Sequence, residues 1–330
     1  MVCLAVLHPR LLVVYVLQEV GLHKLYEHKL ERSAANMCYG PFGRTSSDLE
    51  TSEYDAICVQ SLDGQLSIFE QASFAFSRFL GNFVIPGPLC YCRQLDTFFT
   101  VNSGFELECY KYQTLTSATL SDNNTNTKKS GSSLSDNSFK HGKKLEANWR
   151  YVLGEGCLGI RCSRFAPGLK KSVSRNDVIV LGERTLFVLS SEGECKHQKR
   201  LEYPPTSLAV YPAGPGQVGS NIVVATSTGY LMVYDTKRLI WSAKHGAVPV
   251  ALEILKFRNL DGLIATLDEN GGLAVSYLGT DPPTQVVSTS NEVSFKSSLP
   301  PKGISPLGFP ARVSPRSLAG TRALGTKRGV

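Results

Sequence analysis

The chain has 330 residues and a formal net charge of +7, so it exceeds one small domain and is basic overall. The charge is concentrated in two segments, because residues 284–330 hold seven Lys or Arg against one acid and residues 117–144 hold five Lys against two Asp. The rest of the chain is slightly acidic, which argues against a basic nucleic-acid-binding face on the folded body.

The first eighteen residues, MVCLAVLHPRLLVVYVLQ, are apolar enough to raise the question of a secretory signal or a membrane span. His8, Pro9 and Arg10 interrupt the apolar run, and no Ala-x-Ala-like cleavage site follows. The pattern instead predicts two short strands, residues 3–7 and 11–17, joined by a turn. We therefore expect no leader and no transmembrane segment.

This hairpin pattern recurs along the chain. Five further runs share a short apolar stretch, a turn rich in Gly, Asp, Asn or Ser, and a second apolar stretch with an aromatic residue near its end. The first apolar residues of the six hairpins are Leu4, Ala56, Phe98, Val178, Ile222 and Leu263. They are spaced by 52, 42, 80, 44 and 41 residues, which gives one period near 40 to 50 with a doubled gap in the middle.

The repeats are rich in β-branched and aromatic residues, which favours strands over helices. Further strand-like runs, such as LIWSAKHG and PVALEILKF, bring each repeat to about four strands. Four strands per repeat predict an all-β chain with six blade-like units of a β-propeller. The first hairpin lacks an innermost strand before it and the last lacks an outer strand after it. We therefore expect a propeller that is incomplete at both ends.

Two segments are predicted to be disordered. Residues 117–144 are Ser, Asn, Thr and Lys with little to bury, and they form an insertion between the third and outer strands of one blade. Residues 284–330 are rich in Ser, Pro, Gly and Arg and form a basic tail. The propeller is then predicted to occupy residues 1–283.

The nine cysteines are an odd number and contain no C-x-x-C pair. Several alternate with apolar residues, as buried strand positions do. This pattern predicts reduced thiols in a cytosolic protein and not a disulfide framework.

Three motifs suggest chemistry, but their contexts argue against it. GEGCLG, residues 154–159, matches G-x-G-x-x-G, yet strand-like IRCSRF follows it where a dinucleotide site needs a helix. HKLYEH places His23 and His28 five residues apart, which predicts opposite faces of a strand and no shared metal. The acids Asp63, Glu183 and Asp268 lie in hairpin turns, where acids are ordinary.

The sequence therefore predicts no catalytic, cofactor-binding or metal-binding residue and no cofactor, and it leaves the binding residues unassigned. Aromatic residues recur near the end of the second hairpin strand, and we interpret them as blade packing. They are Phe69, Tyr110, Phe187, Tyr234 and Tyr277.

Several long runs also resemble a known family. They include LAVLHPRLLVVYVL, LYEHKLERSAANMCYGPFG, SLDGQLSIFEQASFAFSRFL, VIVLGERTLFVL and LAVSYLGTDP. These runs are similar to the amino-terminal propeller of the Bardet-Biedl syndrome 9 (parathyroid-hormone-responsive B1) family. The resemblance covers residues 3 to about 283 without the insertion, and it ends beyond Pro283.

The resemblance implies a seven-bladed propeller, of which this chain begins inside the second blade. It also implies a non-enzymatic scaffold subunit of the BBSome, the coat-like complex that moves ciliary membrane proteins and supports cilium assembly. The implied partners are other BBSome subunits and, through them, ciliary membrane proteins and a membrane-recruiting Arf-like GTPase. The implied location is the cytoplasm, the cilium with its basal body and centriolar satellites, and the periphery of the ciliary membrane.

Two alternatives remain open at this point. One is a propeller enzyme with a site at the mouth of the central channel. The other is a truncated product with little function, because a propeller that lacks a blade exposes a sheet edge.

Overall fold

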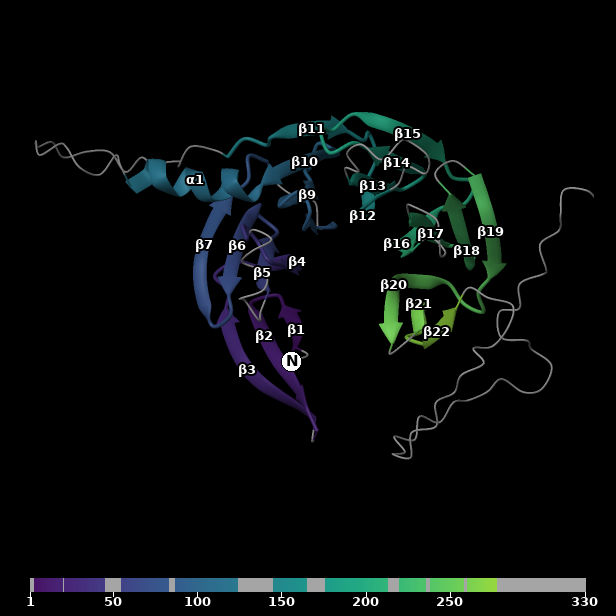
Figure 1. Cartoon of the computed structure of the whole chain (residues 1–330), viewed down its shortest axis with the longest axis horizontal. Coiled ribbons are helices and arrows are strands. Elements are labelled where there is room, and N and C mark those ends of the chain that lie inside the picture. Colours follow the sequence, from purple (N-terminus) through teal and green to yellow (C-terminus); the bar gives the residue numbers. More distant parts are fainter. Residues whose placement is uncertain are drawn as a thin grey trace, which may run out of the picture.

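The computed structural model of the chain describes residues 3–19, 21–44, 55–82, 87–123, 145–164, 176–212, 220–235, 238–257 and 260–277. Within these residues, six antiparallel sheets follow one another along the chain and form an arc around a common centre (Figure 1). Strands that are neighbours in sequence are neighbours in each sheet. The architecture is the predicted all-β arrangement of six propeller blades.

Blades 1 to 3 occupy the amino-terminal half of the arc. Blade 1 contains β1 (Cys3–His8), β2 (Leu11–Gln18) and β3 (Gly21–Lys29). Blade 2 contains β4 (Ala34–Gly40), β5 (Ala56–Ser61), β6 (Gln65–Glu70) and β7 (Ser73–Phe79). Blade 3 contains β8 (Cys90–Cys92), β9 (Thr97–Val101), β10 (Glu106–Lys111) and β11 (Trp149–Val152).

Blades 4 to 6 complete the arc. Blade 4 contains β12 (Cys157–Ser163), β13 (Asp177–Gly182), β14 (Thr185–Leu189) and β15 (Cys195–Arg200). Blade 5 contains β16 (Pro205–Pro212), β17 (Ser220–Thr226), β18 (Tyr230–Asp235) and β19 (Arg238–Lys244). Blade 6 contains β20 (Pro249–Phe257), β21 (Leu260–Asp268) and β22 (Leu273–Tyr277).

Blade 1 is the outer part of a four-stranded unit. In blade 2, the residue after the outer strand donates to the turn of the middle hairpin, with Leu80 N 2.8 Å from Gly64 O. Blade 1 repeats this bond, with Leu30 N 2.9 Å from Arg10 O. Strand β3 therefore corresponds to outer strand β7, and β1 and β2 form the middle hairpin. Among the described residues, blade 1 has no innermost strand, as the sequence predicts.

Blade 6 is the inner part of such a unit. In blade 5, Ser227 N donates to Pro204 O ahead of the innermost strand at 2.9 Å. Blade 6 repeats this contact between Glu269 N and Val248 O at 3.0 Å. Strand β20 is therefore innermost, and within the described part of the chain no outer strand follows β22.

Among the described residues, the hydrophobic core consists of five clusters, each between two successive blades. Strand β5 shows how one strand supplies two of them. Ile57 and Val59 pack toward blade 1, whereas Ala56 and Cys58 pack toward blade 3. Because both faces of a middle strand are buried, its sequence is a continuous apolar run and not an alternation.

The recurring aromatic residues serve this packing. Phe69, Tyr110, Phe187 and Tyr234 are each at most 5% exposed and belong to the inter-blade clusters, which confirms the interpretation of these four. Tyr277 in blade 6 is half-buried.

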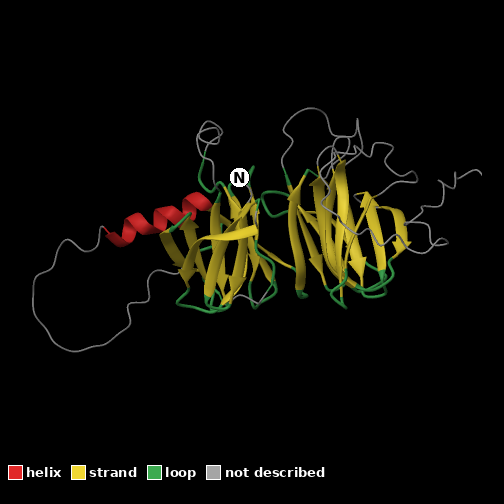
Figure 2. Cartoon of the chain, turned by 90° about the horizontal axis from the view of Figure 1, so that it is seen from below, coloured by secondary structure: helices red, strands yellow, loops and turns green. Residues whose placement is uncertain are grey.

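One helix interrupts blade 3, and the sequence did not predict it. Helix α1 (Tyr112–Asn123) follows β10 and projects outward from the sheets (Figures 1 and 2). Its first turns are anchored, because Leu115 is fully buried in the cluster between blades 2 and 3. The predicted disorder of residues 117–144 thus begins too early, since 117–123 are helical. The insertion does lie between the third and outer strands, as predicted.

Residues 124–144 of that insertion, and the predicted tail at 284–330, lie outside the described residues. Among the helical residues that the structure describes, none form a helix both long and apolar enough to cross a bilayer.

Candidate functional site

The glycine motif GEGCLG lies between two strands. Gly154 occupies the turn after β11 with a φ of 74°, and the last three residues of the motif already belong to β12. A Cβ at Gly156 would lie 2.6 Å from Oε1 of Glu183, and one at Gly159 would lie 3.1 Å from Cβ of Leu208. These glycines allow close packing in and beside blade 4. The motif therefore lacks the strand–turn–helix context of a dinucleotide site.

The placement of the two histidines of HKLYEH differs from the prediction that they lie on opposite faces of a strand. A β-bulge between β2 and β3 makes Val16 the cross-strand partner of His23 and Leu12 the partner of His28. Since Leu12 and Val16 lie on the same face of β2, the two histidines also share a face, and the predicted opposite orientation is wrong. Their partners on β2, Leu12 and Val16, are four residues apart, which is about 13 Å along a strand. His28 packs on Phe69 with ring centroids 4.5 Å apart, and its Nε2 lies 2.9 Å from Gln71 O.

In the part of the chain that the structure describes, no group of three or more His, Cys, Asp or Glu is placed to hold a metal ion.

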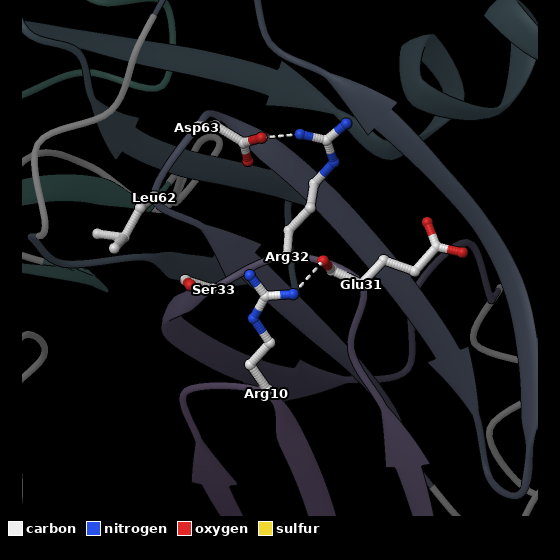
Figure 3. A pocket seen from close by; sticks show the side chains of 6 residues that line it. All are labelled: Arg10, Glu31, Arg32, Ser33, Leu62 and Asp63. Atoms are coloured by element: carbon white, nitrogen blue, oxygen red, sulfur yellow. Dashed lines mark hydrogen bonds and ion pairs between the residues drawn. The ribbon is translucent and has the colours of Figure 1, made fainter.

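The candidate binding site is an open hollow of about 510 Å³ where blades 1 and 2 meet (Figure 3). Three turns at the same end of the two blades form it: the β1–β2 turn, the β3–β4 connection and the β5–β6 turn. Its lining residues are Arg10, Glu31, Arg32, Ser33, Leu62 and Asp63. Turns carried on a rigid sheet framework are common positions for binding residues.

Main-chain hydrogen bonds fix these three turns to one another. Ala34 N donates to Pro9 O at 2.8 Å, and Leu62 N donates to Ser33 O at 2.9 Å. The β5–β6 turn is fixed separately by Ser61, whose Oγ accepts a bond from Gln65 N at 2.9 Å. The hollow is therefore a preformed feature of the blade 1–blade 2 boundary.

The two arginines that line the hollow differ in their partners. Arg32 forms an ion pair with Asp63, and its guanidinium lies 4.6 Å above the ring centroid of Phe79. Arg10 donates from Nη1 to the main-chain oxygen of Glu31 at 2.8 Å, while the Glu31 carboxylate points away from it (Figure 3). Among the described residues, no carboxylate lies within ion-pairing distance of Arg10.

Leu62 adds an apolar surface to the hollow, because its side chain is 45% exposed. An exposed arginine and an exposed leucine that line one hollow can bind a carboxylate or carbonyl of another protein while burying an apolar group. The described residues that line the hollow include neither cysteine nor histidine. The arrangement is therefore suited to recognition of another protein.

A second hollow of about 360 Å³ adjoins the first and shares Glu31 and Arg32 with it. It lies between the outer part of blade 1 and strands β6 and β7, and its wall includes the ring of Phe74, which is 57% exposed. The blade 1–blade 2 boundary thus carries two adjoining hollows.

The sequence named none of these residues as a binding group. In the sequence, Arg10 only interrupts the apolar opening run, and Asp63 is an ordinary turn acid. The available signal was the repeat itself, since turns at equivalent positions of successive blades lie at the same end of the molecule.

Comparison with known proteins shows similarity over most of the chain. A family model described as PTHB1 N-terminal matches residues 1–282. The chain is 38% identical to Protein PTHB1 of Xenopus laevis over 84% of this chain and 32% of that protein. It is also 38% identical to Protein PTHB1 of Mus musculus over 86% of this chain and 31% of that protein. A pthb1 homolog of Caenorhabditis elegans is 26% identical over 84% of this chain and 34% of that protein.

The chain thus spans about a third of the length of the curated relatives it matches. Among solved structures, the fold is similar to that of BBS1N, described as crystallised in complex with ARL6DN. The TM-score is 0.59 at 13% sequence identity, over 83% of this chain and 73% of that one. This likeness supports the propeller architecture.

Proposed function

Because the chain belongs to the family of PTHB1 amino-terminal domains, we propose that it acts as a non-enzymatic scaffold of the BBSome. In this role its blades hold other subunits through protein–protein contacts and so support the trafficking of ciliary membrane proteins and cilium assembly. The observation that carries the proposal is the family match over residues 1–282, together with 37–38% identity to vertebrate Protein PTHB1.

The proposed direct partners are other BBSome subunits. Ciliary membrane proteins and a membrane-recruiting Arf-like GTPase are reached indirectly, through the assembled complex. The similar propeller BBS1N is described in complex with ARL6DN, which supports the second of these partners. The proposed location is the cytoplasm and the cilium, including the basal body and centriolar satellites, peripheral to the ciliary membrane.

The hollow between blades 1 and 2 is the contact surface that we propose for one of these subunits. Arg10 has no carboxylate partner among the described residues, and Leu62 is exposed, so a partner can supply both an acceptor and an apolar surface. Arginine flanked by apolar surface is a frequent energetic centre of protein interfaces.

The test is an affinity purification of the tagged 330-residue chain from ciliated cells, followed by quantitative mass spectrometry. The wild-type chain is compared with Arg10→Glu and with Arg200→Glu, a matched charge reversal at an exposed position on outer strand β15 of blade 4. We expect several BBSome subunits with the wild type and with Arg200→Glu, and fewer with Arg10→Glu.

Recovery of chaperones alone by the wild-type chain would contradict the scaffold proposal and favour a truncated product with little function. Equal recovery of subunits by Arg10→Glu and the wild type would leave the scaffold proposal standing. It would contradict the proposal that the hollow is the contact surface.

A further inference from the structure

Three cysteines meet at the boundary between blades 3 and 4. Cys90 and Cys92 are alternate residues of β8, the innermost strand of blade 3, so they lie on the same face of that strand. Cys162 lies near the end of β12, the innermost strand of blade 4. All three belong to the cluster of side chains that joins the two blades.

The sulfur atoms of Cys90 and Cys162 are close enough to react after a small movement. Their Sγ–Sγ distance is 3.9 Å, and both residues are half-buried. A disulfide needs a separation of about 2 Å, so rotation of one side chain covers most of the difference. The pair lies 72 residues apart in sequence and in different blades.

Cys92 gives the cluster its acid–base chemistry. Its side chain is 1% exposed, and Nδ2 of the buried Asn176 lies 3.6 Å from its sulfur. The hydrogen bond from Cys162 is the largest influence, and with bonds from Asn176 and the main chain of Leu95 and Gln94 it lowers the pKa of Cys92 to about 6. Hydrogen bonds to Cys90 and Cys92 raise the pKa of Cys162. These hydrogen bonds favour the thiolate form of Cys92, so its sulfur is suited to take the proton of the Cys162 thiol.

We propose that Cys90 and Cys162 form a reversible disulfide between blades 3 and 4 in the presence of hydrogen peroxide, with Cys92 as the proton acceptor. This modification site goes beyond the scaffold role, because it gives the boundary between two blades a redox-dependent covalent link.

The reaction balances as a two-electron oxidation of two thiols. Peroxide first oxidises the Cys90 thiol to a sulfenic acid and releases water. The Cys162 sulfur then attacks the sulfenic sulfur, its proton passes to the Cys92 thiolate, and the hydroxide that leaves takes this proton to form a second water. In total, two thiols and one peroxide give one disulfide and two waters. Two external thiol equivalents, such as those of dithiothreitol, reverse the bond.

Two other cysteine sites lack this combination. Cys38 lies opposite Cys58 across β4 and β5, but Cys58 is fully buried and so is shielded from an oxidant. Cys195 is exposed on β15, yet its neighbour is Tyr151 and not a second thiol. Cys195 therefore serves as an accessible control.

The test uses the folded 330-residue chain, reduced and then treated with hydrogen peroxide. Remaining thiols are alkylated, and the chain is cleaved with trypsin without reduction. The expected product joins the peptide FLGNFVIPGPLCYCR to the peptide CSR, which are residues 79–93 and 162–164. Fragment ions that separate Cys90 from Cys92 locate the bond at Cys90, and dithiothreitol removes it.

Variants assign the roles. We expect Cys90→Ser to abolish the link, Cys92→Ser to slow its formation about tenfold, and Cys195→Ser to leave the rate unchanged. A link at Cys92 in place of Cys90, or an unchanged rate in Cys92→Ser, would overturn the proposal. So would oxidation at Cys195 without any link between the two peptides.

Two controls test whether the result depends on the folded structure. Circular dichroism shows whether each variant has the strand content of the wild type. The wild-type chain is also oxidised in concentrated urea, where the native placement is lost. The proposal requires that the Cys90–Cys162 link form at least tenfold faster in the folded chain, and similar rates would overturn it.

Discussion

The carboxylate of Glu108 is fully buried, and its Oε1 lies 3.0 Å from Nε of Arg150 on the neighbouring strand β11. The same carboxylate accepts hydrogen bonds from Asn102 Nδ2 at 2.9 Å, Asn82 Nδ2 at 3.1 Å and the Tyr110 hydroxyl at 2.8 Å. A buried charge is tolerated when it is paired and hydrogen-bonded in this way. The network ties two strands of blade 3 to the loop after β7.

Replacing Glu108 by Ala leaves four donors without their acceptor. We expect this change to lower the free energy of unfolding by about 3 kcal/mol, because several of the orphaned groups are buried. Arg150→Ala is the comparison, with an expected loss of about 1 kcal/mol, since the arginine side chain is 43% exposed. Urea denaturation followed by circular dichroism measures both. Equal losses would show that the ion pair, and not the whole network, carries the stabilisation.

A substitution at Leu186 tests the packing of the inter-blade clusters. This side chain is fully buried between blades 4 and 5, so Leu186→Ala is expected to cost about 3 kcal/mol through lost burial and the cavity left behind. Leu273→Ala in blade 6 is the control, because that side chain is 74% exposed and its loss should cost less than about 0.5 kcal/mol. Similar costs at the two positions would contradict the described core.

Gly193 lies in the β14–β15 turn with a φ of 89°, and a Cβ there would lie 2.6 Å from the ring of Trp149. Gly193→Ala is expected to cost about 2 kcal/mol, because it combines left-handed backbone strain with displacement of the ring. A shift in tryptophan fluorescence should accompany this loss. Gly246→Ala is the matched control, since a Cβ at Gly246 meets no atom within 4 Å. Unchanged fluorescence in Gly193→Ala would show that the indole is placed elsewhere.

The lowered pKa of Cys92 should make the stability of the fold depend on pH. Its pKa falls from 9.0 to about 6 on folding, so between these values the unfolded chain holds a proton that the folded chain does not. Stability should therefore rise with pH across this window, by at most about 1.4 kcal/mol per pH unit, and the contribution is lost as the pH falls through 6. Urea denaturation under reducing conditions should show a smaller slope for Cys92→Ser. An unchanged slope in that variant would refute the assignment.

Above pH 9 the dependence of stability on pH reverses. Burial raises the pKa of Cys109 and of Cys157 to about 12, so these groups stay protonated in the folded chain while the unfolded chain loses their protons. Stability should then decrease with pH above 9, and Cys109→Ser should reduce that decrease.

The architecture could be predicted because each blade encodes it locally. The six hairpins show a shared pattern of apolar runs and turns, and the structure places a strand pair at every one of them. Helix α1 was not predictable from its composition, because Ser and Thr are weak helix formers and its burial depends on Leu115 reaching a cluster made by other blades.

The site was less predictable than the fold. The placement of His23 and His28 depends on a single bulge, which adds one residue and reverses the face of everything beyond it. Arg32 and Asp63 are 31 residues apart, and their ion pair exists only because two blades bring their turns together. The proximity of Cys90 to Cys162 depends in the same way on the packing of neighbouring innermost strands.

The most direct test of the scaffold role is binding of the purified 330-residue chain to BBSome purified from cells that lack the full-length PTHB1 protein, measured by biolayer interferometry. We expect saturable binding that Arg10→Glu weakens at least tenfold and that Arg200→Glu leaves unchanged. Absence of binding by a chain that melts cooperatively as a folded monomer would contradict the proposed function.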